Sequence, residues 1–170
     1  DSDDIWKSDK LQICMEYTNT QVDLIYHDLE IISNDSKIFG RKIARTRKLK
    51  KPIFLDLLLN GNLIGNSSVL VRKDLLDKVG GINENKNLVA AEDYNTWLRI
   101  ARLTDQFIYL PHTLGYYFIH NDGLSNRDMS LPKKLAVEEF LGILNKQQRL
   151  KLEARIRYTS GRFNYLNFNF

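Results

Sequence analysis

Two acidic groups and one histidine are the residues of this chain whose types and spacing suit chemistry. The first group, Asp1-Ser2-Asp3-Asp4, opens the sequence. Carboxylates at alternate positions can converge on one hard divalent cation such as Mg²⁺ or Mn²⁺. That cation could bridge a diphosphate and neutralise the charge that builds on it as a leaving group. The alternative is a solvated acidic cluster, and an EF-hand is disfavoured because Trp6 and Gln12 replace the required Gly and Glu.

The second group is Glu92-Asp93, at the start of a helical pattern. One of these carboxylates could be a general base for a hydroxyl nucleophile, although the helix dipole alone also favours acids in a first turn. His120 follows an apolar strand and could contact a metal or a phosphate, or be an ordinary surface histidine. The segment Gly65-Asn66-Ser67-Ser68 could form a sugar-binding wall or a simple turn.

The elements that must position these residues alternate between extended and helical patterns, which predicts the α/β class. One helix is expected from near Asp9, capped by Ser8, with Leu11, Met15 and, as a further candidate, Cys14 on its inner face. Further helices are expected over 53–59, 73–79, 92–103 and 131–156. Strands are expected at 22–26, 29–32, 67–71, 107–110 and 114–119, the last two separated by a turn at Pro111-His112. The aromatic tail has no clear assignment.

Composition and charge limit the function classes. The chain has 170 residues, 43% of them hydrophobic, and a formal net charge of +4. No apolar run approaches the roughly 18 residues of a membrane-spanning helix, and no secretory signal is recognisable. The lone Cys14 fits a reducing compartment, so a cytoplasmic location is expected. Nucleic-acid binding is disfavoured because the basic stretch Arg41–Lys51 lacks interleaved aromatic residues and a recognisable module.

Four segments, taken in order, resemble bacterial family 2 glycosyltransferases of the GT-A type. Asp1-Ser2-Asp3-Asp4-Ile5-Trp6 with Asp9-Lys10-Leu11 resembles the DxD segment of that family. Residues 67–72 with 79–84 resemble its acceptor-side strand, helix and Gly-Gly loop, and residues 91–100 its Glu-Asp helix. Residues 109–111, 114–117 and 120–125 resemble the strand pair and histidine segment that follow. The order and spacing of the four segments make the resemblance specific over residues 1–126.

The resemblance implies that residues 1–126 are the acceptor-side, C-terminal half of a GT-A mixed sheet flanked by helices, followed by a helical and aromatic tail over 127–170. It implies part of an inverting enzyme that moves a sugar from a nucleotide-diphosphate donor to a glycan or lipid-linked acceptor hydroxyl, in cell-surface polysaccharide biosynthesis. A nucleotide-binding half of about ninety residues is expected before Asp1. The isolated chain is therefore expected to be inactive.

Roles for individual residues follow from the same resemblance. Asp93 would be the general base and Glu92 would orient the acceptor or the base. The donor diphosphate would be contacted by Asp1, Asp3 and Asp4. The Mg²⁺ or Mn²⁺ ion would be held by Asp3, Asp1 and His120.

The acceptor side is assigned to Asn66, Ser67 and Trp97, although the helical spacing of Trp97 is also that of a packing residue. The family often has arginine where this chain has Phe118, so one expected positive contact with the diphosphate is missing. The alternative function is a non-catalytic GT-A-like module that recognises an acidic partner through Arg41–Lys51. In an enzyme, the same stretch could bind an anionic or lipid-linked acceptor, or contact the inner face of the membrane.

Overall fold

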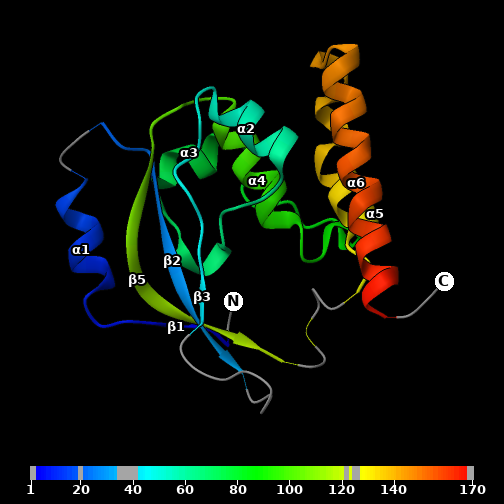
Figure 1. Cartoon of the computed structure of the whole chain (residues 1–170). Helices are drawn as coiled ribbons and strands as arrows, with labels where there is room; N and C mark the ends of the chain where they lie inside the picture. The colour runs from blue at the N-terminus through cyan, green and yellow to red at the C-terminus, as the bar shows by residue number, and fades with distance from the viewer. Residues whose placement is uncertain (1–2, 19–20, 34–41, 121–122, 124–126, 168–170) are drawn as a thin grey trace.

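A mixed five-stranded sheet forms the centre of the molecule (Figure 1). The computed structural model describes residues 3–18, 21–33, 42–120, 123 and 127–167. The strand order is β1-β5-β2-β3, and β4 also pairs with β2. The strands are β1 (Ile5–Trp6), β2 (Leu24–Ser33), β3 (Lys42–Ala44), β4 (Leu70–Val71) and β5 (Phe107–Ile119). Strands β2 and β5 are parallel, whereas the other pairs are antiparallel. The mixed sheet agrees with the predicted α/β class.

Strands β2 and β5 are each continuous where the sequence pattern predicted two shorter strands, so this prediction was wrong. The register between them shifts on either side of Asp28, and Pro111 and His112 lie opposite this shift. Such a bulge absorbs extra residues without ending the strand, and it tolerates a proline that cannot donate to the ladder. The Asp28 carboxylate accepts hydrogen bonds from the Tyr109 hydroxyl at 3.0 Å and the Thr46 amide at 2.9 Å. These bonds hold the irregular segment in place.

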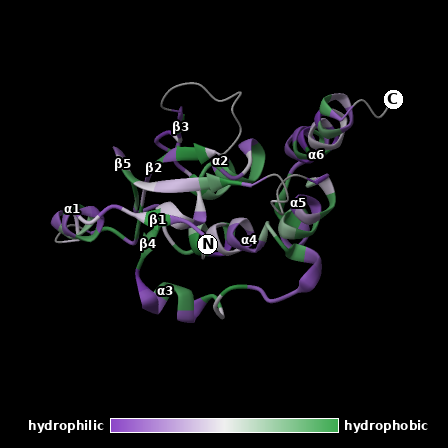
Figure 2. Ribbon diagram, turned by 90° about the horizontal axis from the view of Figure 1, so that it is seen from below, coloured by the Kyte–Doolittle hydropathy of each residue, from purple (hydrophilic) through white to green (hydrophobic). Residues whose placement is uncertain are grey.

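Helices cover both faces of the sheet. They are α1 (Lys10–Glu16), α2 (Ile53–Asn60), α3 (Lys73–Lys78), α4 (Glu92–Ala101), α5 (Ser130–Val137) and α6 (Lys146–Leu166). Short 3-10 helices are η1 (Asn66–Ser68), η2 (Lys86–Leu88) and η4 (Glu138–Ile143). In Figures 1 and 2, α1 lies at one end of the molecule and α5 and α6 at the opposite end, with α2 and α4 between the sheet and α5.

The helix predictions for α1 to α4 are confirmed in position, and α3 ends before Gly80 and Gly81, whose φ angles are 77° and 75°. The predicted buried strand at 67–71 was largely wrong, because η1 occupies its first part and β4 is only two residues long. The unassigned tail is helical as far as Leu166. A capping box between Asn145 and Gln148 starts this helix, which apolar spacing alone did not reveal.

Two apolar clusters fill the two faces of the sheet. The larger contains residues of β2, α2, α4, α5 and α6, and the smaller consists of Cys14, Ile25, Leu110 and Leu114. Helix α1 contributes Cys14 to the smaller cluster, but Leu11 and Met15 are exposed, which corrects the predicted inner face. Helix α1 instead turns Lys10 and Cys14, one turn apart, towards the protein.

The larger cluster runs across the predicted boundary at residue 126. Ala136, Val137, Phe140 and Leu152 belong to the same core as α2 and α4, and the Phe140 ring meets Phe54 edge-on at 5.2 Å. The C-terminal helices therefore share a core with the rest of the chain, and the domain boundary stays a prediction. Across the described residues, no helix combines the length and apolar character needed to cross a membrane.

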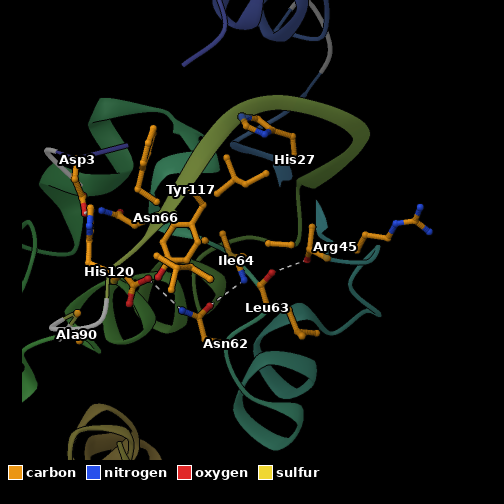
Figure 3. A pocket seen from close by; sticks show the side chains of 18 of the residues that line it. Asp3, His27, Arg45, Asn62, Leu63, Ile64, Asn66, Ala90, Tyr117 and His120 are labelled. Carbon is orange, nitrogen blue, oxygen red and sulfur yellow. Dashed lines mark hydrogen bonds and ion pairs between the residues drawn. The ribbon is translucent and has the colours of Figure 1, made fainter. Parts of the chain in front are cut away.

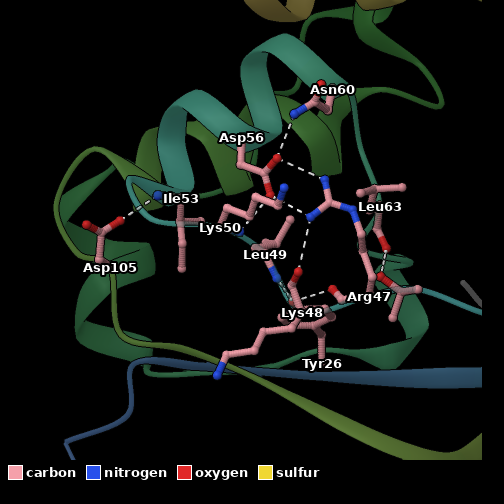
Figure 4. Close-up of polar contacts among 11 residues, drawn as sticks. Tyr26, Arg47, Lys48, Leu49, Lys50, Ile53, Asp56, Asn60, Leu63 and Asp105 are labelled. Atoms are coloured by element: carbon pink, nitrogen blue, oxygen red, sulfur yellow. Dashed lines mark hydrogen bonds and ion pairs between the residues drawn. The ribbon is translucent and has the colours of Figure 1, made fainter.

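Part of the basic stretch is tied to α2 by a buried carboxylate (Figure 4). Asp56, 6% exposed, accepts bonds from the two terminal nitrogens of Arg47 at 2.7 and 2.8 Å. It also accepts from the Lys50 amide at 2.7 Å and the Asn60 amide group at 2.6 Å. The Arg47 guanidinium, ahead of the other contacts, holds the pKa of Asp56 well below its usual range. Tyr26 fastens the same segment to β2 by donating to the Arg47 carbonyl and accepting from the Leu49 amide.

We predict that Asp56→Ala lowers the free energy of unfolding at pH 7 by about 3 kcal/mol. The substitution leaves several partly buried hydrogen-bond donors without an acceptor and Arg47 without its ion-pair partner. The depressed pKa means that this contribution is present above pH ~4 and is lost as the pH falls towards the folded-state value. In urea denaturation, the difference in unfolding free energy between Asp56→Ala and the wild type should therefore be larger at pH 7 than at pH 3. Asp74→Ala is the matched control, since Asp74 forms its ion pairs with Arg72 and Lys78 at the surface. Equal losses in the two variants would contradict the prediction.

Candidate functional site

A cavity of about 930 Å³ lies beside the end of β5 and the middle of β2 (Figure 3). The end of β5, the segment after α2 and the start of α4 all contribute to its walls. Its polar lining includes Asp3, His27, Arg45, Thr46, Asn62, Asn66, Glu92, Asp93 and His120.

The acidic motif is placed at this cavity through the last residues of β5. The Asp3 carboxylate lies 3.4 Å from Nε2 of His120, and both side chains are about half exposed. Asp4 points elsewhere, because its carboxylate accepts from the Phe118 amide at 3.0 Å and from the Ser67 hydroxyl. Asp4 is therefore an anchor for the motif, whereas Asp3 faces the cavity. Asp1 lies outside the described residues.

Asp3 and His120 are the two described residues that fit a metal role. Within the described part of the chain, no group of three or more His, Cys, Asp or Glu side chains could hold a metal ion. Mg²⁺ bound with a nucleotide commonly uses only one or two protein carboxylates, together with phosphate oxygens and water. The oxygen and nitrogen donors of Asp3 and His120 therefore fit Mg²⁺ or Mn²⁺ bound together with a diphosphate.

Lys10, a buried lysine to which the sequence analysis assigned no role, helps to hold the acidic motif in place. Lys10 has no exposed surface, and its Nζ lies 3.7 Å from the centre of the Trp6 ring. Nζ donates to the Ser67 carbonyl at 2.9 Å, and Trp6 Nε1 donates to the same oxygen at 3.0 Å. Burial lowers the pKa of Lys10 to about 8. Because the Ser67 hydroxyl also binds Asp4, these contacts fix the acidic motif against η1.

Asp93 has the electrostatic character of a general base. Burial, with the adjacent Glu92 as a smaller cause, raises its pKa from 3.8 to about 6. The Tyr94 amide donates to one carboxylate oxygen and Asn62 Nδ2 donates to the other at 3.2 Å. The side chain is thus oriented, ionised at neutral pH and more basic than an ordinary aspartate. Asn62 was missed in the sequence because Asn60-Gly61 marked only the end of a helix.

The backbone just before this pair is strained. Ala90 lines the cavity and has φ of 68°, a left-handed conformation that a residue with a Cβ adopts at some cost. Such residues cluster at sites where the surrounding structure holds them in place. The 3-10 helix η2 and the first turn of α4 flank Ala90 on either side. The conformation sets the direction in which Glu92 and Asp93 enter the cavity.

The predicted acceptor residues have three different environments. Asn66 lines the cavity, whereas Ser67 is buried. The Ser67 hydroxyl donates to Asp4, and its carbonyl accepts from Lys10 and Trp6. Trp97 is 4% exposed within the larger core and does not line the cavity, which is the position of a packing residue. Asn66 is thus the one of these three whose placement allows contact with a ligand in the cavity.

The residues of the basic stretch have different environments. Arg45 lines the cavity, Arg47 is paired with Asp56, and the exposed lysines are Lys42, Lys48, Lys50 and Lys51. Arg41 lies outside the described residues. Phe118, where the resembling family often has arginine, lines the cavity and stacks on His120 with ring centres 6.4 Å apart. Arg45 is the described arginine that lines the cavity, and its guanidinium extends away from the other lining side chains (Figure 3).

Comparison with known proteins shows a similarity to a glycosyltransferase. The chain is 27% identical over 143 residues to an uncharacterized glycosyltransferase of Nostoc sp. (strain PCC 7120). The alignment covers 82% of this chain but 43% of that protein, so the chain spans less than half of its relative's length. None of the known protein-family models matches. The similarity supports a glycosyltransferase. Assignment to family 2, a GT-A fold and an inverting reaction are finer statements than this similarity carries.

Asp93→Asn is predicted to stabilise the protein increasingly as the pH rises. In the wild type the raised pKa means that stability is fully present below pH ~4 and falls as the pH rises through about 6. The asparagine variant has no such loss. We expect the two proteins to differ little at pH 4 and the variant to gain about 1–2 kcal/mol at pH 7.5, measured by urea denaturation. Parallel stability curves across this range would show that Asp93 titrates normally.

Proposed function

We propose that this chain is the acceptor-side part of an inverting glycosyltransferase of the family 2, GT-A type. The observation that supports it best is that Asp93, a carboxylate with a raised pKa, and the Asp3–His120 pair line the same cavity. A sugar transfer needs a base for the acceptor hydroxyl and a stabilised diphosphate leaving group. The similarity to a curated glycosyltransferase supports the same class of reaction.

In the proposed reaction, Asp93 accepts the proton of an acceptor hydroxyl. The hydroxyl oxygen forms a bond to the anomeric carbon, and the bond from that carbon to the nucleoside diphosphate breaks on the opposite side. The diphosphate leaves with the electron pair, so the configuration at the anomeric carbon inverts. Asn62 holds the Asp93 carboxylate in position throughout. Mg²⁺ or Mn²⁺, bound by Asp3 and His120, would supply the positive charge that stabilises the leaving diphosphate.

The acceptor proposed is a glycan or a lipid-linked glycan, in cell-surface polysaccharide biosynthesis, with the enzyme in the cytoplasm or at the inner face of the membrane. Arg45 and Asn66 are the described residues of the cavity that could contact substrates without being engaged in the anchoring of Asp4 or Asp56. The nucleotide is proposed to bind mainly to a segment that precedes Asp1.

The alternative is a non-catalytic module that binds an acidic partner through Arg41–Lys51. Arg47 pairs with Asp56, which withdraws one positive charge of the stretch from the surface. The enzyme is favoured because Asp93 and the Asp3–His120 pair line one cavity, an arrangement that a binding module does not need.

The first test of the proposal is metal-nucleotide binding. Mn²⁺ with UDP or GDP would be titrated by calorimetry into this chain, and into the chain joined to the proposed upstream half of about ninety residues. We expect binding in the longer protein, weakened at least tenfold by Asp3→Ala. Asp77→Ala is the matched control, since Asp77 is an exposed carboxylate on α3 away from the cavity. If no nucleotide binds with either metal, the binding module becomes the better explanation.

A second test separates the base from the metal site. In the longer protein, Asp93→Asn should leave the Mn²⁺-nucleotide affinity unchanged but reduce sugar transfer by about 10²–10⁴-fold, the usual contribution of a positioned base. Transfer by the wild type should decline about tenfold per pH unit below pH about 6, where Asp93 becomes protonated. An Asp93→Asn variant that retains full transfer would remove Asp93 from the mechanism.

A further inference from the structure

A second, smaller cavity lies between the end of α2, the first turn of α4 and the C-terminal helices α5 and α6. Its volume is about 50 Å³, enough for more than one water-sized group. Asn62, Tyr94, Lys133, Arg155 and Thr159 provide its polar lining. The reaction proposed above uses neither Lys133 nor Arg155. Asn62 lines both this cavity and the larger one, so the two are neighbours on either side of a single side chain that also holds Asp93.

Positive charge is in excess around the small cavity. Lys133 is only partly exposed, and its pKa is lowered by burial first and then by repulsion from Arg155 and Arg162. Asp128 is the acid that acts on Lys133 in the opposite direction, and its carboxylate already accepts bonds from the Ser130 amide and the Ser160 hydroxyl. Through the described residues, no hydrogen bond or ion pair joins the Lys133 ammonium or the Arg155 guanidinium to a carboxylate.

The end of α2 does not neutralise this cluster. A helix C-terminus carries only about half a negative charge, which together with Asp128 is less than the three cations present. Gly61, the residue after α2, has φ of 82°, and a Cβ there would lie 2.6 Å from two nitrogens of the Arg155 guanidinium. The glycine therefore leaves room for the guanidinium directly beside Asn62. Arg155 and Arg162 are exposed, so Lys133 is the one partly buried cation of this cluster, and an anion in the cavity would offset its repulsion from the arginines.

We propose that this cavity is an anion subsite, in which Lys133 and Arg155 bind a phosphate or carboxylate group. Arginine pairs with such groups through two parallel hydrogen bonds, and lysine adds a point charge. Resting on the transferase proposed above, the subsite would hold the anionic group of an acidic acceptor while the acceptor hydroxyl reaches Asp93 past Asn62. The acceptor is then a phosphorylated or acidic glycan, or a glycan linked to an anionic lipid.

The test uses the full chain and inorganic phosphate as the probe, followed by the amide NMR signals of Gly61, Asn62 and Tyr94. Phosphate should shift these signals saturably in the wild type, and Lys133→Met and Arg155→Met should each weaken the apparent affinity at least tenfold. Lys134→Met and Arg157→Met are the matched controls, because neither residue lines the cavity although each lies next to or near its counterpart on the same helix. Absence of saturable shifts in the wild type, or equal weakening by the controls, would overturn the subsite.

Folding of the variants is checked by thermal unfolding without phosphate, where Lys133→Met should be at least as stable as the wild type because it removes a repelled cation. Phosphate should then raise the unfolding midpoint of the wild type but not of Lys133→Met. If Lys133→Met gains as much from phosphate as the wild type, the subsite is wrong.

Two further arms distinguish the source of the anion. In the first, binding to phosphatidylglycerol vesicles is measured for the wild type and Lys133→Met, with phosphatidylcholine vesicles as the reference. Weaker binding by Lys133→Met would support a lipid headgroup. In the second, binding to a soluble sugar phosphate is measured for the same two proteins. If Lys133→Met weakens binding to the sugar phosphate but not to the vesicles, the result would support a free acidic glycan. Neither arm involves Mn²⁺ or nucleotide, so failure of the subsite and failure of the transferase proposal give different results.

Discussion

The parallel pairing of β2 with β5 is the interaction on which the rest of this structure depends. The two strands lie side by side at the centre of the sheet, and every other strand pairs with one of them. Apolar clusters cover both of their faces, as parallel strands require. The larger cavity lies beside this pair, lined by the end of β5 and by His27 and Leu29 of β2. The bulge at Asp28 allows the pairing to continue until β5 brings Phe118 and, just after the strand, His120 to this cavity.

Three aspartates show how the fold assigns different tasks to the same side chain. Asp56 accepts four hydrogen bonds, two of them from Arg47, so its pKa is depressed and it acts as a structural anion. Asp93 is also withdrawn from water but has no cationic partner among its contacts, so its pKa rises. Asp4 is fully engaged by Phe118 and Ser67, which frees the adjacent Asp3 to face the cavity. Environment, more than residue type, therefore separates anchor from candidate catalyst.

The two cavities meet at Asn62, and this arrangement links the chemistry to the C-terminal helices. Asn62 follows α2, which packs against both α4 and α6, so its position depends on three helices at once. One side of Asn62 holds the proposed base, and the other faces Lys133 and Arg155. A substrate that spans both cavities would place its hydroxyl in the larger cavity and its negatively charged group in the smaller one. The helices of the tail would then take part in substrate recognition as well as in the core.

The sequence by itself determined the features that depend on local pattern. Helical spacing and the Gly80-Gly81 end located α3 and α4, and the acids at the start of α4 marked Asp93 as a candidate before its environment was known. The resemblance singled out Asp3, Asn66 and His120, and all three line the same cavity as Asp93, while their roles stay predictions.

Only the tertiary structure decided the features that depend on contacts between distant residues. It made β2 and β5 continuous, because a bulge forms only when two strands are already paired. It buried Lys10 through bonds to Ser67, 57 positions away, and placed Trp97 in the core. Likewise, the raised pKa of Asp93 and the cluster around Lys133 arise from burial by other helices. Burial and electrostatic coupling are properties of the packed chain, and local sequence pattern carries no direct information about them.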